Sequence, residues 1–318
     1  MLQVRDVLLG IAIDPIPHEP GEFRVEDARD PEIRFGSGSK PYCERERVRL
    51  LESRFGAPRQ NFIARTLGGK QLWADVFHHA GWRIQEGLSG GHCRLLDTAD
   101  RRRAWGSYEE CRVAFERVRL SSGLRPKARH AVVLLHGLIR AKDSLRALSR
   151  ALFDAGYEVM DINYPSTRRN VEDFADQVRL VLERTRGIDH VSFVTHSLGG
   201  IVVRAVLAEK DPVWRERLEV HRLLMIFPPN NGAAIADKWR DHPLAKAVMG
   251  PVLGELSAEQ PPPWPAPDCP FAIIAGARDK TVSIDEAWLP EAEQVQLLDV
   301  EHTFGMSDPT VVRAAVRY

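Results

Sequence analysis

Three side chains that can cleave an ester together are spread along the second half of the chain: Ser197, Asp279 and His302. A serine hydroxyl attacks a carbonyl carbon readily only when a histidine removes its proton. A carboxylate then orients that histidine and stabilises its charged form. These three residue types predict nucleophilic catalysis through a covalent acyl-enzyme, provided that the fold brings them together.

Ser197 has the surroundings of a nucleophile elbow. A short apolar run at 191–194 precedes it, and Gly199 and Gly200 follow it at the predicted start of a helix. The turn of such an elbow is sharp enough to require small residues two positions before and after the serine. Gly199 meets this need downstream, but Thr195 stands where the usual pattern has glycine. A serine that merely caps a buried helix remains an alternative for this near match.

The candidate acid and base each follow an apolar run that predicts a strand. Asp279 comes shortly after the run at 271–275, and His302 comes after the run at 295–298. Taken singly, a loop aspartate is typical of a turn and a loop histidine is typical of a solvated surface. Their joint placement favours catalysis, with Asp299 and Glu301 as the next candidates for the acid.

A fourth requirement is a pair of backbone N–H groups that stabilise the developing oxyanion. Gly137 follows His136 at the end of the first predicted strand and lets the backbone approach the reacting carbonyl closely. We expect the N–H groups of Leu138 and Leu198 to form this oxyanion hole, assisted by the positive end of the helix that follows Ser197. We expect His136 to have a supporting role rather than to be the catalytic base.

These residues need a parallel sheet to position them, and the chain after about residue 131 has the required alternation of strands and helices. The predicted strands are 131–135, 158–162, 191–194, 223–227, 271–275 and 295–298. The predicted helices open at Asp143 or Ser144, at Asn170, after Ser197 and at Pro309. We expect Gly156 and Gly187 to end the first two helices.

The pattern predicts two domains, an appendage at 1–125 and an α/β domain at 126–318. Within the α/β domain, the irregular stretch at about 232–265 ends in a proline-rich run and predicts a lid over the site, with a plain surface insertion as the alternative. In the appendage, residues 16–60 are expected to be partly extended and 108–120 helical, which predicts a small α+β unit. Its tryptophans are expected to be core residues: Trp73, Trp82 and Trp105.

Composition limits the possible partners. Of the 318 residues, 44 are Lys or Arg and 44 are Asp or Glu, so a net charge near zero argues against a nucleic-acid partner. The basic run at 101–103 is expected to form a solvated turn. The first 13 residues are too short and too poor in basic residues to predict a membrane span or a secretory signal. We therefore expect a cytoplasmic protein.

No metal site is predicted. The four cysteines are widely spaced without a C-x-x-C pair, which is typical of reduced thiols rather than of a zinc site or a disulfide framework: Cys43, Cys93, Cys111 and Cys269. The adjacent pairs His78-His79 and His92-Cys93 chelate poorly because neighbouring side chains point in different directions.

From about residue 130 onward the chain resembles the lipase and esterase branch of the α/β-hydrolase superfamily, including GPI-inositol-deacylase-like and bacterial lipase-like proteins. The resemblance rests on five short segments: 135–137, 195–200, 228–232, 274–279 and 302–304. It implies an α/β-hydrolase fold with a mostly parallel sheet, and a triad of Ser197, Asp279 and His302. It also implies an oxyanion hole at Leu138 and Leu198, with His136, Gly137, Thr195, His196 and Gly199 as supporting residues. The resemblance does not extend to residues 1–125, which leaves the substrate open.

The resulting hypothesis is a serine esterase that needs no cofactor and acts on a small-molecule or lipid ester. The apolar residues Leu138, Leu198 and Phe304 favour an apolar acyl group, and peripheral contact with a membrane remains open. Alternatives with the same triad are a thioesterase and an acyltransferase, and a non-catalytic binding protein is a third. A dinucleotide-binding fold is disfavoured because no G-x-G-x-x-G follows the first strand.

Overall fold

The computed structural model describes residues 4–6, 10–16, 19, 21–27, 33–56, 64–65 and 70–318. The chain divides into two compact units. The first unit contains Met1–Leu67 and Phe77–Arg125, and the second contains Gly68–Val76 and Pro126–Tyr318. Residues 70–76, which the sequence pattern assigns to the appendage, therefore belong to the same compact unit as the α/β domain.

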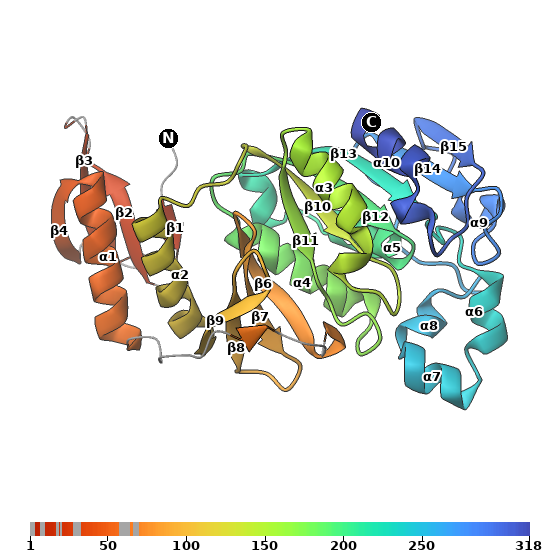
Figure 1. The fold of residues 1–318 in the computed structure, drawn as a ribbon, viewed down its shortest axis with the longest axis horizontal. Coiled ribbons are helices and arrows are strands. Elements are labelled where there is room, and N and C mark those ends of the chain that lie inside the picture. The colour runs from red at the N-terminus through yellow and green to blue at the C-terminus, as the bar shows by residue number, and fades with distance from the viewer. Residues whose placement is uncertain are drawn as a thin grey trace. The chain divides into compact units, whose positions relative to one another are not determined.

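A six-stranded sheet forms the centre of the second unit (Figure 1). Its strands, in chain order, are β10 (His130–Leu135), β11 (Glu158–Ile162), β12 (His190–His196), β13 (Glu219–Ile226), β14 (Phe271–Gly276) and β15 (Gln294–Leu298). They are arranged in the order β11-β10-β12-β13-β14-β15, and every neighbouring pair is parallel. The chain reverses its direction of growth between β10 and β12, which creates the crevice where ligands bind in open α/β sheets.

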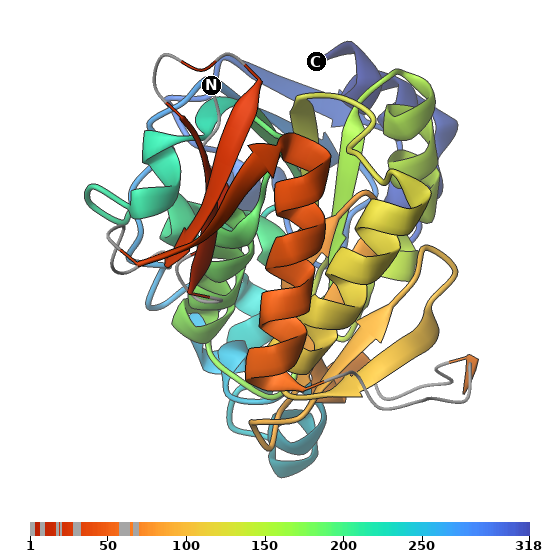
Figure 2. The ribbon, with the colours of Figure 1, turned by 90° about the vertical axis from the view of Figure 1, so that its left-hand side faces the viewer.

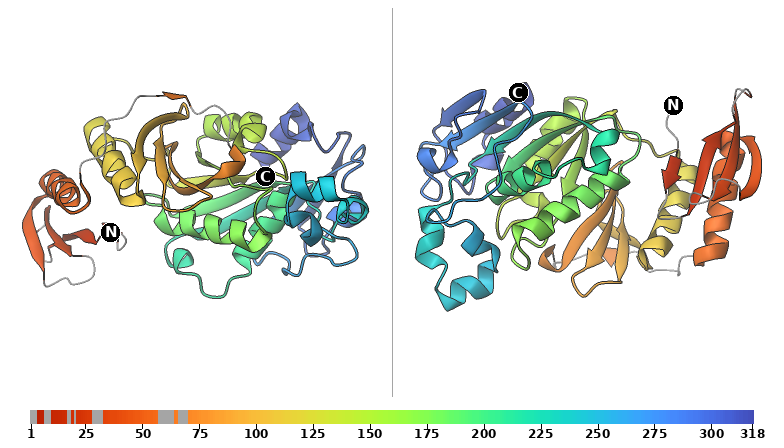
Figure 3. Two further views of the ribbon diagram at one scale, coloured as in Figure 1. Left: turned by 90° about the horizontal axis from the view of Figure 1, so that it is seen from below. Right: turned by 180° about the vertical axis from the view of Figure 1, so that it is seen from behind.

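Helices cover both faces of this sheet (Figure 3). The long helices are α3 (Arg146–Asp154), α4 (Val171–Arg184), α5 (Leu198–Leu207) and α10 (Pro309–Arg317), and the short helix α9 (Ile284–Ala287) follows β14. Val133 and Leu135 of β10 pack on the face covered by α4 and α5. Val132 and Leu134 point to the opposite face, covered by α3 and α10, as the two-residue side-chain period of a strand requires.

The stretch between β13 and β14 folds into three short helices. They are α6 (Ala234–Trp239), α7 (Pro243–Met249) and α8 (Val252–Glu255), which Figure 1 shows as a separate group beside the sheet. Gly232, with φ of +80°, opens this insertion, and a Cβ there would collide with the backbone at Ser257. The beginning of the insertion, at Gly232, and its end, at Ser257, are thus in close contact.

The first unit contains two antiparallel sheets, each with one helix. The first sheet consists of β1 (Val4–Asp6), β2 (Ile11–Pro15), β3 (Glu22–Asp27) and β4 (Arg34–Ser39), with α1 (Lys40–Phe55) packed on it. The second consists of β5 (Ala64–Arg65), β6 (Trp73–His79), β7 (Trp82–Gly87), β8 (Cys93–Leu96) and β9 (Arg101–Gly106), followed by α2 (Tyr108–Ser122). The first four residues of β6, 73–76, are grouped with the second unit. Figure 2 shows α1 beside α2.

Buried ion pairs connect α1 and α2. Glu116 of α2 lies 3.6 Å from Arg47 of α1 and is also bonded to Arg112 and Arg119 of its own helix. Burial alone would raise the pKa of Glu116, but the three guanidinium groups together lower it to about 2. The carboxylate is therefore charged, and it joins the two halves of the unit.

Several details differ from the expectations. The run at 101–103 belongs to strand β9 and is not a turn, and Arg103 pairs with Asp97 at 2.8 Å. Within the range 16–60, which was expected to be partly extended, β3 and β4 are strands, whereas residues 40–55 form a helix that the sequence pattern did not indicate. Gly187 does not end α4, which stops at Arg184 with Thr185 as its C-cap. Of the three tryptophans, Trp82 is buried, whereas Trp73 and Trp105 are only partly buried.

The described residues contain no helix long and apolar enough to cross a membrane. The same residues hold no group of three or more His, Cys, Asp or Glu side chains with the geometry of a metal site. All four cysteines are free thiols.

Candidate active site

Ser197 occupies the tight turn between β12 and α5. Its backbone has φ of +51° and ψ of −121°, a conformation that is strained for any residue with a side chain. Its N–H donates to the carbonyl of Ile226 at 2.9 Å, which anchors the turn to the neighbouring strand. The surrounding sheet thus maintains the strain, as expected of a nucleophile elbow.

The two glycines after Ser197 make the turn sterically possible. A Cβ at Gly199 would lie 2.5 Å from the carbonyl oxygen of Leu135, so α5 can approach β10 only because that position is glycine. A Cβ at Gly200 would lie 2.9 Å from Pro228 and 3.6 Å from the hydroxyl of Thr195. The room at Gly200 explains why threonine is tolerated at 195, where its hydroxyl reaches the carbonyl of Leu224 at 3.5 Å.

The structure brings the three candidate catalytic side chains into one chain of hydrogen bonds. The Ser197 Oγ lies 3.0 Å from Nε2 of His302, and Nδ1 of the same ring lies 2.7 Å from Oδ2 of Asp279. Ser197 follows β12, Asp279 follows β14 and His302 follows β15. Because these strands are parallel, the three residues lie at the same carboxyl edge of the sheet. With Nδ1–H donated to the carboxylate, Nε2 is left as the base that faces the hydroxyl.

Backbone hydrogen bonds hold the carboxylate of Asp279. Its Oδ1 accepts from the N–H groups of Thr281 and Val282 at 2.7 and 2.9 Å, and its side chain is fully buried. The alternative acid Asp299 is 82% exposed and pairs with Arg278 at 2.9 Å. Glu301 is also exposed. The geometry therefore favours Asp279 over both alternatives.

The loop after β10 lies directly against the nucleophile. A Cβ at Gly137 would be 3.1 Å from Cβ of Ser197 and 2.7 Å from Nδ1 of His196. Leu138 follows in this loop, and Ile139 has φ of +61°, which is unusual for a β-branched residue. On the other side of the serine, Leu198 is the first residue of α5, and the first N–H groups of a helix lack an intrahelical acceptor.

His136 supports this loop. It is fully buried and its ring stacks on Tyr164 with centroids 4.2 Å apart. The Tyr164 hydroxyl donates to the carbonyl of His136, and Nδ1 of His136 lies 2.9 Å from the carbonyl of Gly137. These contacts hold the ring and the backbone of His136 in place within the core, which is consistent with a supporting role.

His196, next to the nucleophile, is also buried. Its Nε2 donates to the carbonyl of His302 at 3.2 Å, so it holds the backbone of that residue. Burial, followed by the charge of His302, keeps the pKa of His196 well below the usual value, and His196 is therefore neutral. Among the described residues its Nδ1 has no hydrogen-bond partner.

Sequence reasoning missed two further residues at the site. Phe227 follows β13 with φ of +52°, and its ring centroid lies 5.7 Å from that of His302 and 6.0 Å from that of His196. A Cβ at Gly305 would collide with the same ring. Phe227 thus limits the positions open to His302, and an aromatic residue at a strand end gave no signal of this role.

The second missed residue, Gln71, comes from the segment that precedes β6. Its amide nitrogen donates to the carbonyl of Arg140 at 2.7 Å, and its amide oxygen accepts from the N–H of Thr167 at 3.1 Å. It thereby joins the loop after β10 to the loop after β11. An isolated glutamine far from the other site residues carries no recognisable pattern in the sequence.

A cavity of about 330 Å³ opens beside Ser197 and His302. Its apolar lining comes mainly from the three-helix insertion: Ile235, Ala236, Trp239, Met249, Leu253 and Leu256. Of the apolar residues named from the sequence, only Leu138 lines it. Leu198 is fully buried in the core, and Phe304 is 74% exposed and does not line the cavity, so both expectations were wrong.

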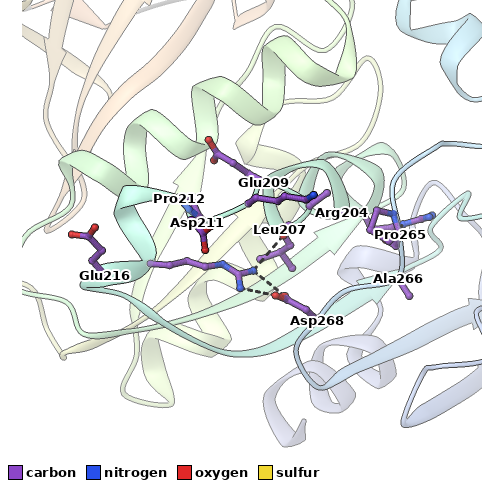
Figure 4. Close-up of a pocket in the computed structure, with 12 residues that line it drawn as sticks. Arg204, Leu207, Glu209, Asp211, Pro212, Glu216, Pro265, Ala266 and Asp268 are labelled. Atoms are coloured by element: carbon purple, nitrogen blue, oxygen red, sulfur yellow. Dashed lines mark hydrogen bonds and ion pairs between the residues drawn. The ribbon is translucent and has the colours of Figure 1, made fainter.

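A larger cavity of about 690 Å³ lies at the far end of α5 (Figure 4). Burial lowers the pKa of its Arg204 to about 10, and backbone carbonyls of Asn230, Trp264 and Pro265 accept from its guanidinium. Arg215 is paired with Asp268 at 2.6 Å, and dashed lines in Figure 4 mark the bonds that reach the labelled Asp268. The residues that line this cavity include no serine, cysteine or histidine, whereas the smaller cavity contains Ser197 and His302, so the smaller one is the candidate active site.

Comparison with protein families matches part of the chain. Residues 125–227 match the family model described as "Putative serine esterase (DUF676)". The matched segment contains β10 to β13, including Ser197 and the loop at 137–140. Together with the parallel sheet, it supports the lipase and esterase branch of the α/β-hydrolases, which confirms the resemblance expected from the sequence. No curated protein matches the chain.

Solved structures resemble part of this chain at low identity. A lipase-esterase related protein from Clostridium acetobutylicum is 13% identical with a TM-score of 0.44, over 60% of this chain and 93% of that one. The lipase BlEst2 from Bacillus licheniformis is 16% identical with a TM-score of 0.44, over 58% and 91%. The metagenomic carboxyl esterase MGS0156 is 15% identical with a TM-score of 0.49, over 60% and 75%. None of these resemblances indicates a substrate.

Proposed function

We propose that this chain, an α/β-hydrolase of the lipase and esterase branch, hydrolyses carboxylic esters through an acyl-enzyme formed on Ser197. The observation that carries the proposal is the continuous hydrogen-bond chain from Ser197 through His302 to Asp279, with separations of 3.0 and 2.7 Å. A strained serine with no catalytic role would not need a histidine and a buried carboxylate in this alignment.

The first half-reaction forms the acyl-enzyme. Nε2 of His302 takes the proton of Ser197 while the serine oxygen attacks the ester carbonyl, and Asp279 stabilises the imidazolium without taking its proton. The tetrahedral intermediate collapses by breaking the bond to the alcohol, which leaves with the proton from His302. Water then repeats the sequence on the acyl-enzyme and releases the carboxylic acid, so that the enzyme returns to its starting state.

The oxyanion of each intermediate would lie against the N–H groups of Leu138 and Leu198. Support comes from the close approach of Gly137 to Ser197 and from the position of Leu198 at the start of α5. A helix N-terminus adds a favourable field for negative charge. Removal of one such donor typically costs a factor of about 10² to 10³ in kcat.

The shape of the cavity favours an apolar acyl group. Side chains of α6 and α8 line it, and its volume of about 330 Å³ is near the lower end of that of small-molecule sites. An acyl chain of short or medium length is therefore the preferred substrate, because a long chain would have to extend beyond the cavity.

Covalent labelling tests the proposal. The wild-type protein should react with a fluorophosphonate probe and should hydrolyse p-nitrophenyl butyrate. Ser197→Ala should lose both activities while retaining its circular dichroism spectrum. Ser121→Ala, which alters an exposed serine at the end of α2, should retain both.

Labelling that persists in Ser197→Ala would contradict the assignment of the nucleophile. Product analysis in the presence of glycerol separates ester hydrolysis from acyl transfer, since a hydrolase releases free acid as the main product. Glycerol ester as the main product would instead identify an acyltransferase.

A further inference from the structure

The candidate active site contains one unexpected feature, the side chain of Arg140. It is the single permanently charged side chain among the described residues that line the 330 Å³ cavity. The other lining residues are apolar, apart from hydroxyl groups and the rings of His196 and His302. A half-buried cation in an apolar cavity costs free energy unless something offsets it, so its position calls for an explanation.

Nothing in the part of the chain that the structure describes neutralises Arg140. Among the described residues, no carboxylate lies within 4.0 Å of its guanidinium, whereas the nearby Lys142 and Arg146 both lie close to Asp143, at 3.8 and 3.0 Å. The carboxylate nearest to the reacting centre, that of Asp279, does not line the cavity and is already bonded to His302 and two backbone N–H groups. Arg140 therefore retains its full capacity to bind an anion.

The backbone of Arg140 is held in place on both sides. Its N–H donates to the carbonyl of Gly137 at 3.2 Å, and its carbonyl accepts from Gln71 at 2.7 Å. Between these bonds, Ile139 adopts its strained positive φ. Such anchoring fixes where the arginine side chain begins, two residues after Leu138 in the loop that faces Ser197.

The positive charge of Arg140 affects His196, the residue next to Ser197. The pKa of His196 is lowered first by burial and next by His302, and the guanidinium of Arg140 acts in the same direction. Arg140 and Ser197 line the same cavity, so an anion bound by Arg140 would be close to Ser197. A guanidinium offers parallel N–H donors that match a carboxylate or a phosphate.

We propose that Arg140 binds an anionic group, a carboxylate or a phosphate, on the alcohol part of the ester, while the apolar cavity wall formed by α6 and α8 accepts the acyl part. This inference rests on the proposed ester hydrolysis and names its substrate class. The natural substrate is then an ester of an apolar acid with a negatively charged alcohol.

A series of butyrate esters that differ only in charge tests this inference. The esters of 3-hydroxybenzoate, 3-hydroxybenzamide and 3-(trimethylammonio)phenol carry a negative, a neutral and a positive group at the same position. The wild-type protein should show the highest kcat/KM for the anionic ester, at least tenfold above that for the neutral ester, which corresponds to about 1.4 kcal/mol. The cationic ester should be the poorest substrate.

Variants of Arg140 assign the preference to its charge. In Arg140→Gln the ratio of kcat/KM for the anionic and neutral esters should fall at least tenfold, and this double ratio cancels the intrinsic reactivities of the esters. Arg140→Lys should retain part of the preference, because a lysine keeps the charge but loses the paired donors. Arg150→Gln, which alters an exposed arginine of α3, should retain the full preference.

Equal kcat/KM values for the three esters in the wild-type protein would overturn this inference alone. The same applies if Arg140→Gln lowers the values for all three esters by one common factor, since that result indicates a structural role. A wild-type protein that hydrolyses none of the three would overturn the proposed function, and this inference with it.

Discussion

At the scale of single residues, the account depends on how firmly each member of the Ser197, His302 and Asp279 chain is held. The serine is fixed by a strained turn and the carboxylate by two backbone N–H groups. The histidine is limited by Phe227 on one side and by the bond from His196 to its carbonyl. The geometry is thus organised before a substrate binds, which is a requirement for efficient general-base catalysis.

Replacing the acid tests its identity. Asp279→Asn should lower kcat for p-nitrophenyl butyrate by about 10⁴, because an amide at this position favours the wrong tautomer of the histidine. Steady-state kinetics of the purified variants would measure the change. Asp299→Asn is the matched control and should alter kcat less than twofold; a large loss in that variant, with little loss in Asp279→Asn, would move the acid to Asp299.

The residue types and their order along the chain were sufficient to predict Ser197, Asp279 and His302 as candidates. Phe227, Gln71 and Arg140 could not be predicted in the same way. Phe227 and Gln71 act through contacts with segments distant in the sequence, and Arg140 is distinguished only by the cavity that such segments help to line. All three are residue types that are common outside active sites. Their roles become visible only when the strand order brings the loops together.

At the scale of elements, the segment before β6 contributes to the site. Residues 70–76 belong to the second unit, and Gln71 joins the loop at 137–140 to the loop that contains Thr167. Asp75 extends this connection, since its carboxylate accepts from the N–H of Asn163 at 2.7 Å. Part of the amino-terminal region therefore supports the catalytic loops.

Removing the amide of Gln71 tests this role. Gln71→Ala should lower kcat roughly tenfold with a smaller change in KM, because loss of about 1 to 1.5 kcal/mol of hydrogen bonding loosens the loop that carries Leu138. Gln294→Ala, at an exposed position of β15, should leave both constants unchanged. A rise in KM at constant kcat would show that Gln71 affects substrate binding and not the position of the loop.

The elements of the second unit were largely predictable because buried parallel strands are short apolar runs between helices. Helix α1 could not be predicted from the sequence, for a physical reason. Its buried stripe includes the charged Arg47, whose partner Glu116 is on α2, so the segment lacks the usual apolar periodicity. The capping boxes of α2 and α4 mark clearer starts, with Ser107 and Asn170 as N-caps.

At the scale of the whole molecule, buried ionisable groups make stability depend on pH. Burial lowers the pKa of His79 to about 4, below the value of about 6.5 expected in the unfolded chain. The unfolded state therefore binds this proton first as the pH falls. The stabilisation of the folded state that comes from keeping His79 neutral is fully present above about pH 6.5 and is lost progressively as the pH falls towards 4.

Urea unfolding at pH 7.5 and pH 4.5 measures this effect. His79 alone should lower the free energy of unfolding by about 2 to 3 kcal/mol between these values. His79→Gln should reduce the pH dependence by that amount, while His92→Gln, at an exposed position, should not. An unchanged pH dependence in His79→Gln would show that other groups cause the loss. Glu116, with its pKa near 2, adds a further loss only below about pH 4.5.

The most direct measurement is the capture of the acyl-enzyme. The wild-type protein is mixed with p-nitrophenyl butyrate, quenched with acid within the first turnovers and analysed by peptide mass spectrometry. The account predicts a butyryl group on the peptide that contains Ser197, absent from Ser197→Ala. Ester hydrolysis that proceeds without such an adduct under conditions of rapid acylation, or an adduct on another residue, would contradict it.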